Sequence, residues 1–371
     1  MKLFQPILFL AFNIVCHGQD LPIRQNEYLT EKYARGHMKQ KLRQNVRIVF
    51  YNVENLYDPF NDTLKLDDEY TAHGIRHWTY SRFREKLNHV AKTFIAMGSD
   101  EPPAIIGMCE VENQYVLKKL VEESPLKRFR YRIIHHESPD NRGVDVALLY
   151  RHDRFVQIDC KTFPVHFPFD TAAQTREILL VKGTLFQSDT INLLINHWPS
   201  RRGGYEESQP KRNYVASLVK SICDSVFMKE PVSRIVLMGD LNDEPDKESL
   251  TLFLGTKQDT MNIKPTDLVN LMYPKIKYWN EGTIKYQGQW SVFDQFIVSG
   301  NLVSCSNGIH TSFNDAHIFT STFLTLPDDK AFGVKLNRTY TGPKYTGGFS
   351  DHLPIYLDIW KTEEVFGSLG H

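Results

Sequence analysis

The feature of this sequence that most constrains its fold is a set of short apolar runs that end abruptly at polar residues. The run at 234–239 is followed by Asp240 and Asn242, and the run at 46–51 is followed by Asn52. Apolar runs of this length, rich in β-branched residues, predict buried strands. The same arrangement recurs at Glu110, His197 and Asp294 and, in reverse order, at Asp351 and His352, which precede the run 353–359. These polar strand ends predict one shared site.

The rest of the chain predicts an α/β (α+β) fold in which strands dominate. Expected helices lie at 77–98, where apolar residues recur at helical spacing, and at 206–229. Expected strands cover residues 46–53, 102–113, 131–138, 144–151, 176–185, 190–198, 235–242, 291–300 and 353–360. A turn at 139–143 is expected to join two of them as a hairpin. Such a mixture can build two packed sheets covered by helices, with residues 255–285 as an elaboration of the same domain.

The first 18 residues have the pattern of an export signal. Lys2 precedes an apolar run at 7–15 that is too short to span a membrane, and small residues stand near a cleavage point after Gly18. We therefore expect a periplasmic or secreted protein, with an N-terminal arm at 19–44. Lipid attachment at Cys16 is the less favoured alternative, because Val15 is bulky. The other cysteines fit neither a zinc site nor a dense disulfide framework: Cys109, Cys160, Cys223 and Cys305.

Charge balance argues against a protein that binds DNA through bulk electrostatics. The chain has 44 Lys and Arg against 44 Asp and Glu, so its formal net charge is +0. Such a binder usually carries a strong basic excess. A local basic patch remains compatible with this composition.

The polar residues at the strand ends suit phosphate chemistry that is assisted by a hard cation. Mg²⁺ prefers oxygen ligands and keeps several waters, so one or two carboxylates and a substrate phosphate are its usual partners. Asp240 and Asn242 are two residues apart and, in extended backbone, face the same way. Asp351 and His352 place a carboxylate beside an imidazole that titrates near neutrality, and His197 adds a second imidazole.

Six motifs carry a resemblance to a known superfamily. They are NVENLYD (52–58), CEVEN (109–113), NHWPSRRGG (196–204), GDLNDEP (239–245), FDQFIVSG (293–300) and SDHLPI (350–355). In this order they resemble the endonuclease/exonuclease/phosphatase superfamily, whose members include deoxyribonucleases, apurinic endonucleases and sphingomyelinases, and most closely an exported bacterial branch. The resemblance covers about residues 45–362, leaving a tail at 363–371. It implies a four-layer α/β sandwich, with two mixed sheets face to face and helices outside.

The resemblance also implies metal-dependent hydrolysis and a role for each motif residue. Glu110 would be the main Mg²⁺ ligand, with Asn52 and Asp351 in support; Mn²⁺ and Ca²⁺ are the alternative ions. Asp240 would orient or deprotonate the attacking water, and Asn242 would bind a phosphoryl oxygen. His352 would contact the phosphate, with Asp294 orienting a catalytic histidine. His197 would be a second phosphate donor or assist the leaving group, with Asp145 as its candidate partner.

Several residues keep two interpretations. Arg201 and Arg202, and more weakly Arg142, are either substrate-binding residues at the rim of the site or solvated loop residues. Glu54 is either an auxiliary metal ligand or a surface or structural carboxylate. Asp243 to Pro245 are expected to form a structural turn. Asn337-Arg338-Thr339 matches a glycosylation sequon by pattern only.

The function predicted from these observations is a Mg²⁺-dependent phosphodiesterase of nuclease type, acting by in-line attack of water. Its partner would be a phosphate-ester substrate, either nucleic acid or a small phosphodiester, with no stable membrane insertion and no obligate protein partner. The alternatives are a sphingomyelinase or phospholipid hydrolase, an inositol-phosphate phosphatase and, less favoured, a phosphate-binding protein without catalysis. The segment 279–290 is the nearest to a membrane-dipping hairpin, but its pattern favours part of a sheet.

Overall fold

The computed structural model describes residues 40–98, 101–259, 261–279, 281–304 and 308–365. Residues Arg43–Glu363 form one compact unit, and the description below concerns this unit. The predicted signal at 1–18, most of the predicted arm and Cys305 lie outside the described residues. Residues 40–44, which we expected in the arm, begin a strand instead.

Two sheets of seven strands each form the centre of the unit. In sheet A the order is β14 (Gly308–His310), β20 (Ile355–Val365), β1 (Gln40–Leu56), β2 (Ile105–Val111), β4 (Asp145–Arg151) and β3 (Tyr131–His135), and β15 (Ala316–Ile318) also pairs with β20. In sheet B the order is β5 (Phe155–Phe163), β6 (Ile178–Leu185), β7 (Asp189–His197), β8 (Ile235–Asp240), β13 (Asp294–Ser299), β10 (Leu268–Asn270) and β9 (Thr256–Lys257). Both sheets are mixed: β1–β2 and β7–β8 are parallel, whereas β2–β4 and β8–β13 are antiparallel.

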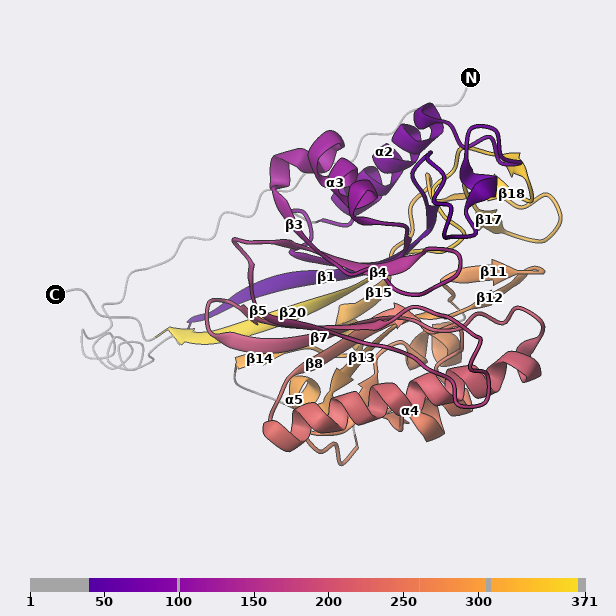
Figure 1. The fold of residues 1–371 in the computed structure, drawn as a ribbon. Coiled ribbons are helices and arrows are strands. Elements are labelled where there is room, and N and C mark those ends of the chain that lie inside the picture. The colour runs from indigo at the N-terminus through magenta and orange to yellow at the C-terminus, as the bar shows by residue number, and fades with distance from the viewer. Residues whose placement is uncertain (1–39, 99–100, 260, 280, 305–307, 366–371) are drawn as a thin grey trace, which may run out of the picture. The chain divides into compact units, whose positions relative to one another are not determined.

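Helices cover the outer face of each sheet, as Figure 1 shows. The longer ones are α2 (Tyr80–Ala96), α3 (Gln114–Glu123) and α4 (Tyr205–Lys229). Shorter helical segments are η2 (Asp68–Tyr70), η3 (Pro125–Phe129), η4 (Ser249–Phe253), η5 (Lys275–Trp279), α5 (Gly300–Ser304) and η6 (Phe313–Asp315). The expected helices at 77–98 and 206–229 correspond to α2 and α4, so both are confirmed. None of the helices in the described part of the chain is long and apolar enough to cross a bilayer.

Three apolar layers hold the sandwich together, and the two-residue period of β1 shows how. Ile48 and Phe50 point into the layer between the sheets, whereas Val49 and Tyr51 point to the layer under α2 and α3. A third layer lies between sheet B and α4. The sheets approach closely at Gly107, where a Cβ atom would lie 2.6 Å from the sulfur of Met238. The predicted four-layer sandwich is therefore the observed fold.

Two elements differ from the sequence prediction. β5 was not predicted, because most of its side chains are solvent-exposed or half-buried and its apolar pattern is weak. The segment 279–290 was expected to be part of a sheet, and it contributes to one, but that sheet is a separate two-stranded hairpin of β11 (Ile284–Tyr286) and β12 (Gln289–Ser291). Two further small hairpins are β16 (Thr325–Pro327) with β17 (Val334–Leu336), and β18 (Tyr340–Thr341) with β19 (Lys344–Tyr345).

Candidate active site

The polar strand ends of both sheets meet at one end of the sandwich. In sheet B, His197 on β7 is in register with Asp240 on β8, and Asp240 is in register with Asp294 on β13. From sheet A, the Asn52 side-chain amide donates to Asp240 Oδ2 at 3.0 Å. The sequence prediction that these tips share one site is thus met by direct contacts between the two sheets.

Asp240 is the centre of this cluster. Its carboxylate Oδ2 lies 3.8 Å from Nε2 of His197 and 3.7 Å from Nε2 of His352. On the far side of His352, Nδ1 contacts Asp294 Oδ2 at 2.6 Å. All four side chains are buried, so their charges act on one another with little screening by water.

The surroundings push the two imidazoles toward opposite protonation states. Burial alone would lower the pKa of His352, but the carboxylates of Asp294 and Asp240 outweigh it and hold that pKa well above its usual value. Burial, with Arg176 and Arg142 acting in the same direction, lowers the pKa of His197 well below its usual value. At neutral pH the site therefore offers one charged imidazole and one neutral imidazole.

The pKa of Asp240 is raised to about 6, chiefly by burial and also by the charge of Asp294. Hydrogen bonds from the Asn52 side chain and the Asn242 backbone oppose this shift, as does His352. The carboxylate is thus ionised at neutral pH and more basic than an ordinary aspartate. A carboxylate with these properties can accept a proton from a bound water.

Glu110 lies at a break in β2 and not within the Asp240 cluster. Its φ of 60° interrupts the strand, and the register of β2 with β4 shifts between Cys109 and Val111. One carboxylate oxygen accepts from the Asn55 amide at 2.9 Å, and the other lies 3.6 Å from the Arg142 guanidinium. The predicted rim residue Arg142 therefore stands beside the predicted metal ligand.

Asp351 is held by a cation that the sequence analysis missed. Arg338 donates to Asp351 at 2.8 Å and to Glu54 at 3.2 Å, and Glu54 also accepts from the Thr339 amide. Glu54 is buried, which excludes the surface interpretation. Lys86, fully buried behind it, donates to the Thr339 hydroxyl. The only signal for Arg338 in the sequence was the sequon pattern, which gives no indication of this contact.

The groups that could hold a metal ion are only partly those expected. Among the described residues, three sets of His, Cys, Asp or Glu bring their ligand atoms within 4.8 Å of one another: Cys109–His197–Asp240, His135–Glu137–Asp145 and Asp240–Asp294–His352. Glu110 and Asp351 belong to none of them; each instead has an arginine beside its carboxylate, Arg142 for Glu110 and Arg338 for Asp351. Oxygen donors dominate the region, which fits a hard divalent cation.

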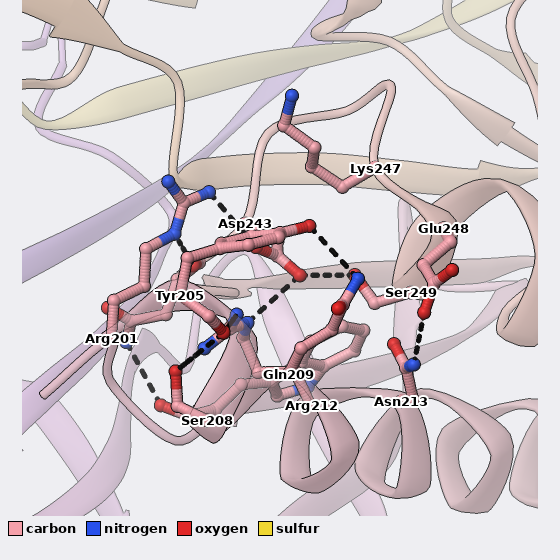
Figure 2. A network of polar contacts seen from close by, with 12 residues as sticks. Arg201, Tyr205, Ser208, Gln209, Arg212, Asn213, Asp243, Lys247, Glu248 and Ser249 are labelled. Carbon is pink, nitrogen blue, oxygen red and sulfur yellow. Dashed lines mark hydrogen bonds and ion pairs between the residues drawn. The ribbon is translucent and has the colours of Figure 1, made fainter. Parts of the chain in front are cut away.

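The turn after Asn242 is fixed by a network of polar contacts around Asp243, shown in Figure 2. The Asn242 side chain donates to the Trp198 carbonyl at 3.0 Å, and its φ is 51°. The next residue, Asp243, is fully buried. It accepts hydrogen bonds from Arg201 at 3.0 Å and Ser249 at 2.7 Å, and it forms an ion pair with Arg212 at 2.9 Å. This is the structural turn that the sequence predicted at Asp243.

Arg201 and Asp145 differ from their predicted roles. Arg201 binds the Asn242 carbonyl as well as Asp243, and it stacks on Phe293, so its guanidinium fixes the turn and is not free at the rim. The predicted pairing of Asp145 with His197 was wrong, because both oxygens of the Asp145 carboxylate are engaged by residues of its own sheet edge. Its carboxylate instead contacts His135 at 3.1 Å and the backbone amide of Ser138 at 3.0 Å. His197 Nδ1 has no hydrogen-bond partner within the described part of the chain.

Arg176 is a further residue that the sequence analysis did not single out. Its guanidinium is buried, contacts Asp140 at 3.1 Å and donates to the Trp198 carbonyl at 2.7 Å. The same carbonyl accepts from Asn242, so Arg176 lies directly beside the cluster. Arg202 is exposed and makes no hydrogen bond or ion pair within the described part of the chain, which fits both a rim residue and a solvated loop residue.

Solved structures with this fold are numerous, at low sequence identity. An endonuclease/exonuclease/phosphatase family protein from Bacteroides thetaiotaomicron is 16% identical, covers 89% of this chain and 100% of its own, and has a TM-score of 0.53. A mannosyl-6-phosphatase from Bacteroides thetaiotaomicron is 17% identical (85% and 99% covered, TM-score 0.52). The human Nocturnin catalytic domain with bound sulfate is 13% identical (88% and 98%, TM-score 0.51). At these identities the likeness concerns the fold alone.

A search of curated proteins gives no match. The sequence pattern of the Endonuclease/Exonuclease/phosphatase family, in contrast, matches residues 47–361, which is most of the chain. That range contains every strand end of the cluster described above. Together with the four-layer sandwich, this match shows that the chain belongs to the endonuclease/exonuclease/phosphatase family, whose members hydrolyse phosphate esters.

Proposed function

We propose that this protein is a divalent-metal-dependent phosphodiesterase of nuclease type, acting by direct attack of water on phosphorus. The observation that carries the proposal is the buried Asp240 carboxylate, flanked by one charged and one neutral imidazole. A base and a cationic donor that face the same point are what in-line displacement at a phosphate requires.

Each residue of the cluster has a role that follows from its contacts. Asp240 orients the water and accepts its proton, since its pKa is raised to about 6 by burial. His352, held charged by Asp294, donates to a phosphoryl oxygen as negative charge grows there. His197 is neutral and can donate one N–H to the phosphate or the leaving oxygen. Asn242 keeps its side chain at the same edge through its bond to Trp198.

Glu110 is the proposed principal metal ligand, and Asn52 and Asp351 are the proposed supporting ligands. When bound, the ion would neutralise charge on the phosphate and leaving group. We propose Mg²⁺, with Mn²⁺ and Ca²⁺ as alternatives, because the donors are oxygens. In this proposal the negative charge of Glu110 is neutralised jointly by the ion and by Arg142, and that of Asp351 by the ion and by Arg338.

The test is hydrolysis of bis(4-nitrophenyl) phosphate by the purified protein with Mg²⁺, Mn²⁺ or Ca²⁺, and with chelator. We expect metal-dependent release of nitrophenol that Asp240→Asn lowers by two orders of magnitude or more, about the range for a lost acid–base group. We also propose that residues 1–18 are an export signal that is removed from the mature protein. The form to assay is therefore residues 19–371. Equal rates with chelator and with metal would reject the metal mechanism.

A lipid phosphodiesterase is the second candidate, and one observation favours it. The β11–β12 hairpin is joined to the site by a bridge between Ile284 and His352, and it exposes Tyr286. Phe332 and Val334, in or next to the neighbouring β16–β17 hairpin, are also exposed. Hydrolysis of sphingomyelin or phospholipid vesicles that Tyr286→Ser abolishes, while activity on bis(4-nitrophenyl) phosphate persists, would support this candidate over the nuclease type.

A further inference from the structure

A cavity beside the cluster contains polar groups that the proposed reaction does not use. Its volume is about 260 Å³, and it lies between the segment 173–176, the loop after His197 and the first turns of α4. Thr175, Arg176, Arg202 and Lys211 are among the residues that line it. It is therefore a separate recess next to the proposed site of hydrolysis.

Two buried polar atoms in the wall of this cavity have no partner in the described part of the chain. They are the Thr175 hydroxyl oxygen and Nε of Arg176. Thr175 is 6% exposed and Arg176 is 7% exposed, so open solvent does not satisfy them. A buried polar group without a hydrogen bond is costly, and such groups in a folded protein call for an explanation.

The chemistry of these atoms indicates what is missing. Nε of Arg176 can only donate, and a guanidinium prefers an anionic acceptor. Lys211 and Arg202 add further donors, although Lys211 also contacts Asp170 at 2.6 Å. One carboxylate, that of Glu207, lines the cavity and opposes an anion. The donors outnumber it, and phosphate oxygens accept several hydrogen bonds at once.

The cavity is connected to the reaction centre through a single carbonyl. The Trp198 carbonyl accepts from Arg176 at 2.7 Å and from the proposed phosphate-binding residue Asn242 at 3.0 Å. A phosphate held by Thr175 and Arg176 would thus be a near neighbour of the phosphate that is hydrolysed. We propose that this cavity binds a second phosphate group of the substrate, an inference that rests on the proposed function and narrows its substrates to molecules with two phosphates.

The proposal is tested first by binding, in chelator, so that no turnover is needed. The probes are thymidine 3′,5′-bisphosphate against thymidine 5′-monophosphate, and glucose 1,6-bisphosphate against glucose 6-phosphate, measured by calorimetry. We expect the wild type to bind one bisphosphate about tenfold more tightly than its monophosphate, as a charge-assisted hydrogen bond implies. If the bisphosphate binds more tightly than its monophosphate in the thymidine pair, the second phosphate belongs to a nucleotide; if it does so in the glucose pair, it belongs to a sugar.

Thr175→Val and Arg202→Gln should each reduce this advantage about fivefold, since each removes about one hydrogen bond. Arg132→Gln is the matched control: Arg132 is an exposed residue of β3 that does not line the cavity, and its variant should keep the full advantage. Equal affinity for both members of each pair, or an advantage unchanged in both variants, would mean that the cavity holds only water. An equal loss in Arg132→Gln would mean that the effect is general surface charge.

A second arm separates this inference from the proposed function. Thymidine 5′-(4-nitrophenyl phosphate), with and without a 3′-phosphate, is assayed with Mg²⁺. If the substrate with the 3′-phosphate is hydrolysed faster and Thr175→Val reduces this difference in rate, both the phosphodiesterase and the second-phosphate site are supported. A binding advantage without hydrolysis of either substrate would reject the phosphodiesterase but keep the second-phosphate site. If both substrates are hydrolysed at the same rate and the bisphosphates bind no more tightly than the monophosphates, the phosphodiesterase is supported and the second-phosphate site is rejected.

Discussion

Replacing Asp294 with Asn tests whether the buried Asp294 carboxylate keeps His352 protonated. The carboxylate of Asp294 is fully buried and contacts His352 Nδ1 at 2.6 Å, and it is the largest influence that raises the pKa of His352. Asparagine keeps the size but removes the charge. Burial then meets only the opposing charges of Asp240 and Asp351, and the pKa of His352 should fall.

The size of the effect follows from the burial of both groups, and its sign from the direction of the shift. Removing one partner of a buried ion pair costs about 3–5 kcal/mol, and we expect the lower end because His352 can release its proton. A histidine whose folded pKa is raised stabilises the protein fully below its unfolded pKa of about 6.5, and that stabilisation is lost as pH rises through the folded value. Asp294→Asn should therefore lower the free energy of unfolding by about 3 kcal/mol at about pH 7. Above the folded pKa of His352 the loss should fall to about 1 kcal/mol, that of a neutral hydrogen bond.

Urea denaturation in chelator across this pH range is the assay, and Asp358→Asn is the control. Asp358 contacts Arg47 through both oxygens, at 2.8 and 2.7 Å, and an arginine stays charged throughout the range. Its variant should lose about 2 kcal/mol at every pH. A loss for Asp294→Asn that is flat with pH, or that grows as pH rises, would show that His352 is not held charged by Asp294.

Three further predictions concern the metal, the packing and a buried lysine. Mg²⁺ at about 100 times its dissociation constant should stabilise the wild type by roughly 2.7 kcal/mol, measured as a shift of the thermal midpoint. Glu110→Gln should abolish most of this shift. An unchanged shift would assign the ion to other ligands. Gly239→Ala should cost about 2–3 kcal/mol in urea denaturation, because its Cβ would lie 2.5 Å from the Asn196 carbonyl, and a wild-type midpoint would contradict the close approach of β7 and β8. Burial lowers the pKa of Lys86 to about 8. The wild type should therefore gain stability relative to Lys86→Met as pH rises from about 8 to about 10, because the unfolded chain then binds more protons, and a constant difference would contradict this.

Much of the fold was predictable because its strands are either fully buried or patterned with a period of two. β7 and β8 end where an apolar run meets His197 and Asp240, and in β1 and β2 the regular pairing breaks where the apolar run meets Asn52 and Glu110. β5 was missed because an edge strand with a largely exposed surface needs little apolar patterning. The strand character of the β11–β12 hairpin was predicted, but only the tertiary structure shows that these two strands form a sheet of their own, apart from the two large sheets.

The candidate site was predictable at the strand ends but not in the loops. Asn52, His197, Asp240, Asp294 and His352 come together because each lies at the end of a strand or just before one, and sheet topology fixes where strands end. Arg338 and Arg176 could not be inferred, because their partners lie far away in the sequence. The pairing of Asp145 failed for a different reason: its partner His135 lies only ten residues away, on the neighbouring strand β3, and belongs to none of the six motifs.

The site also depends on how the two sheets pack, since no single sheet contains it. Asn52 belongs to sheet A and Asp240 to sheet B, and their hydrogen bond crosses between the sheets. The layer that sets their separation includes Phe50 and Met238, each two residues before one of these groups and buried between the sheets. Because successive side chains alternate along a strand, Phe50 shares a face with Asn52, and Met238 with Asp240. Residues that look purely structural therefore set the distance on which the reactivity of Asp240 depends, and the apolar run is as much part of the site as the polar residue that ends it.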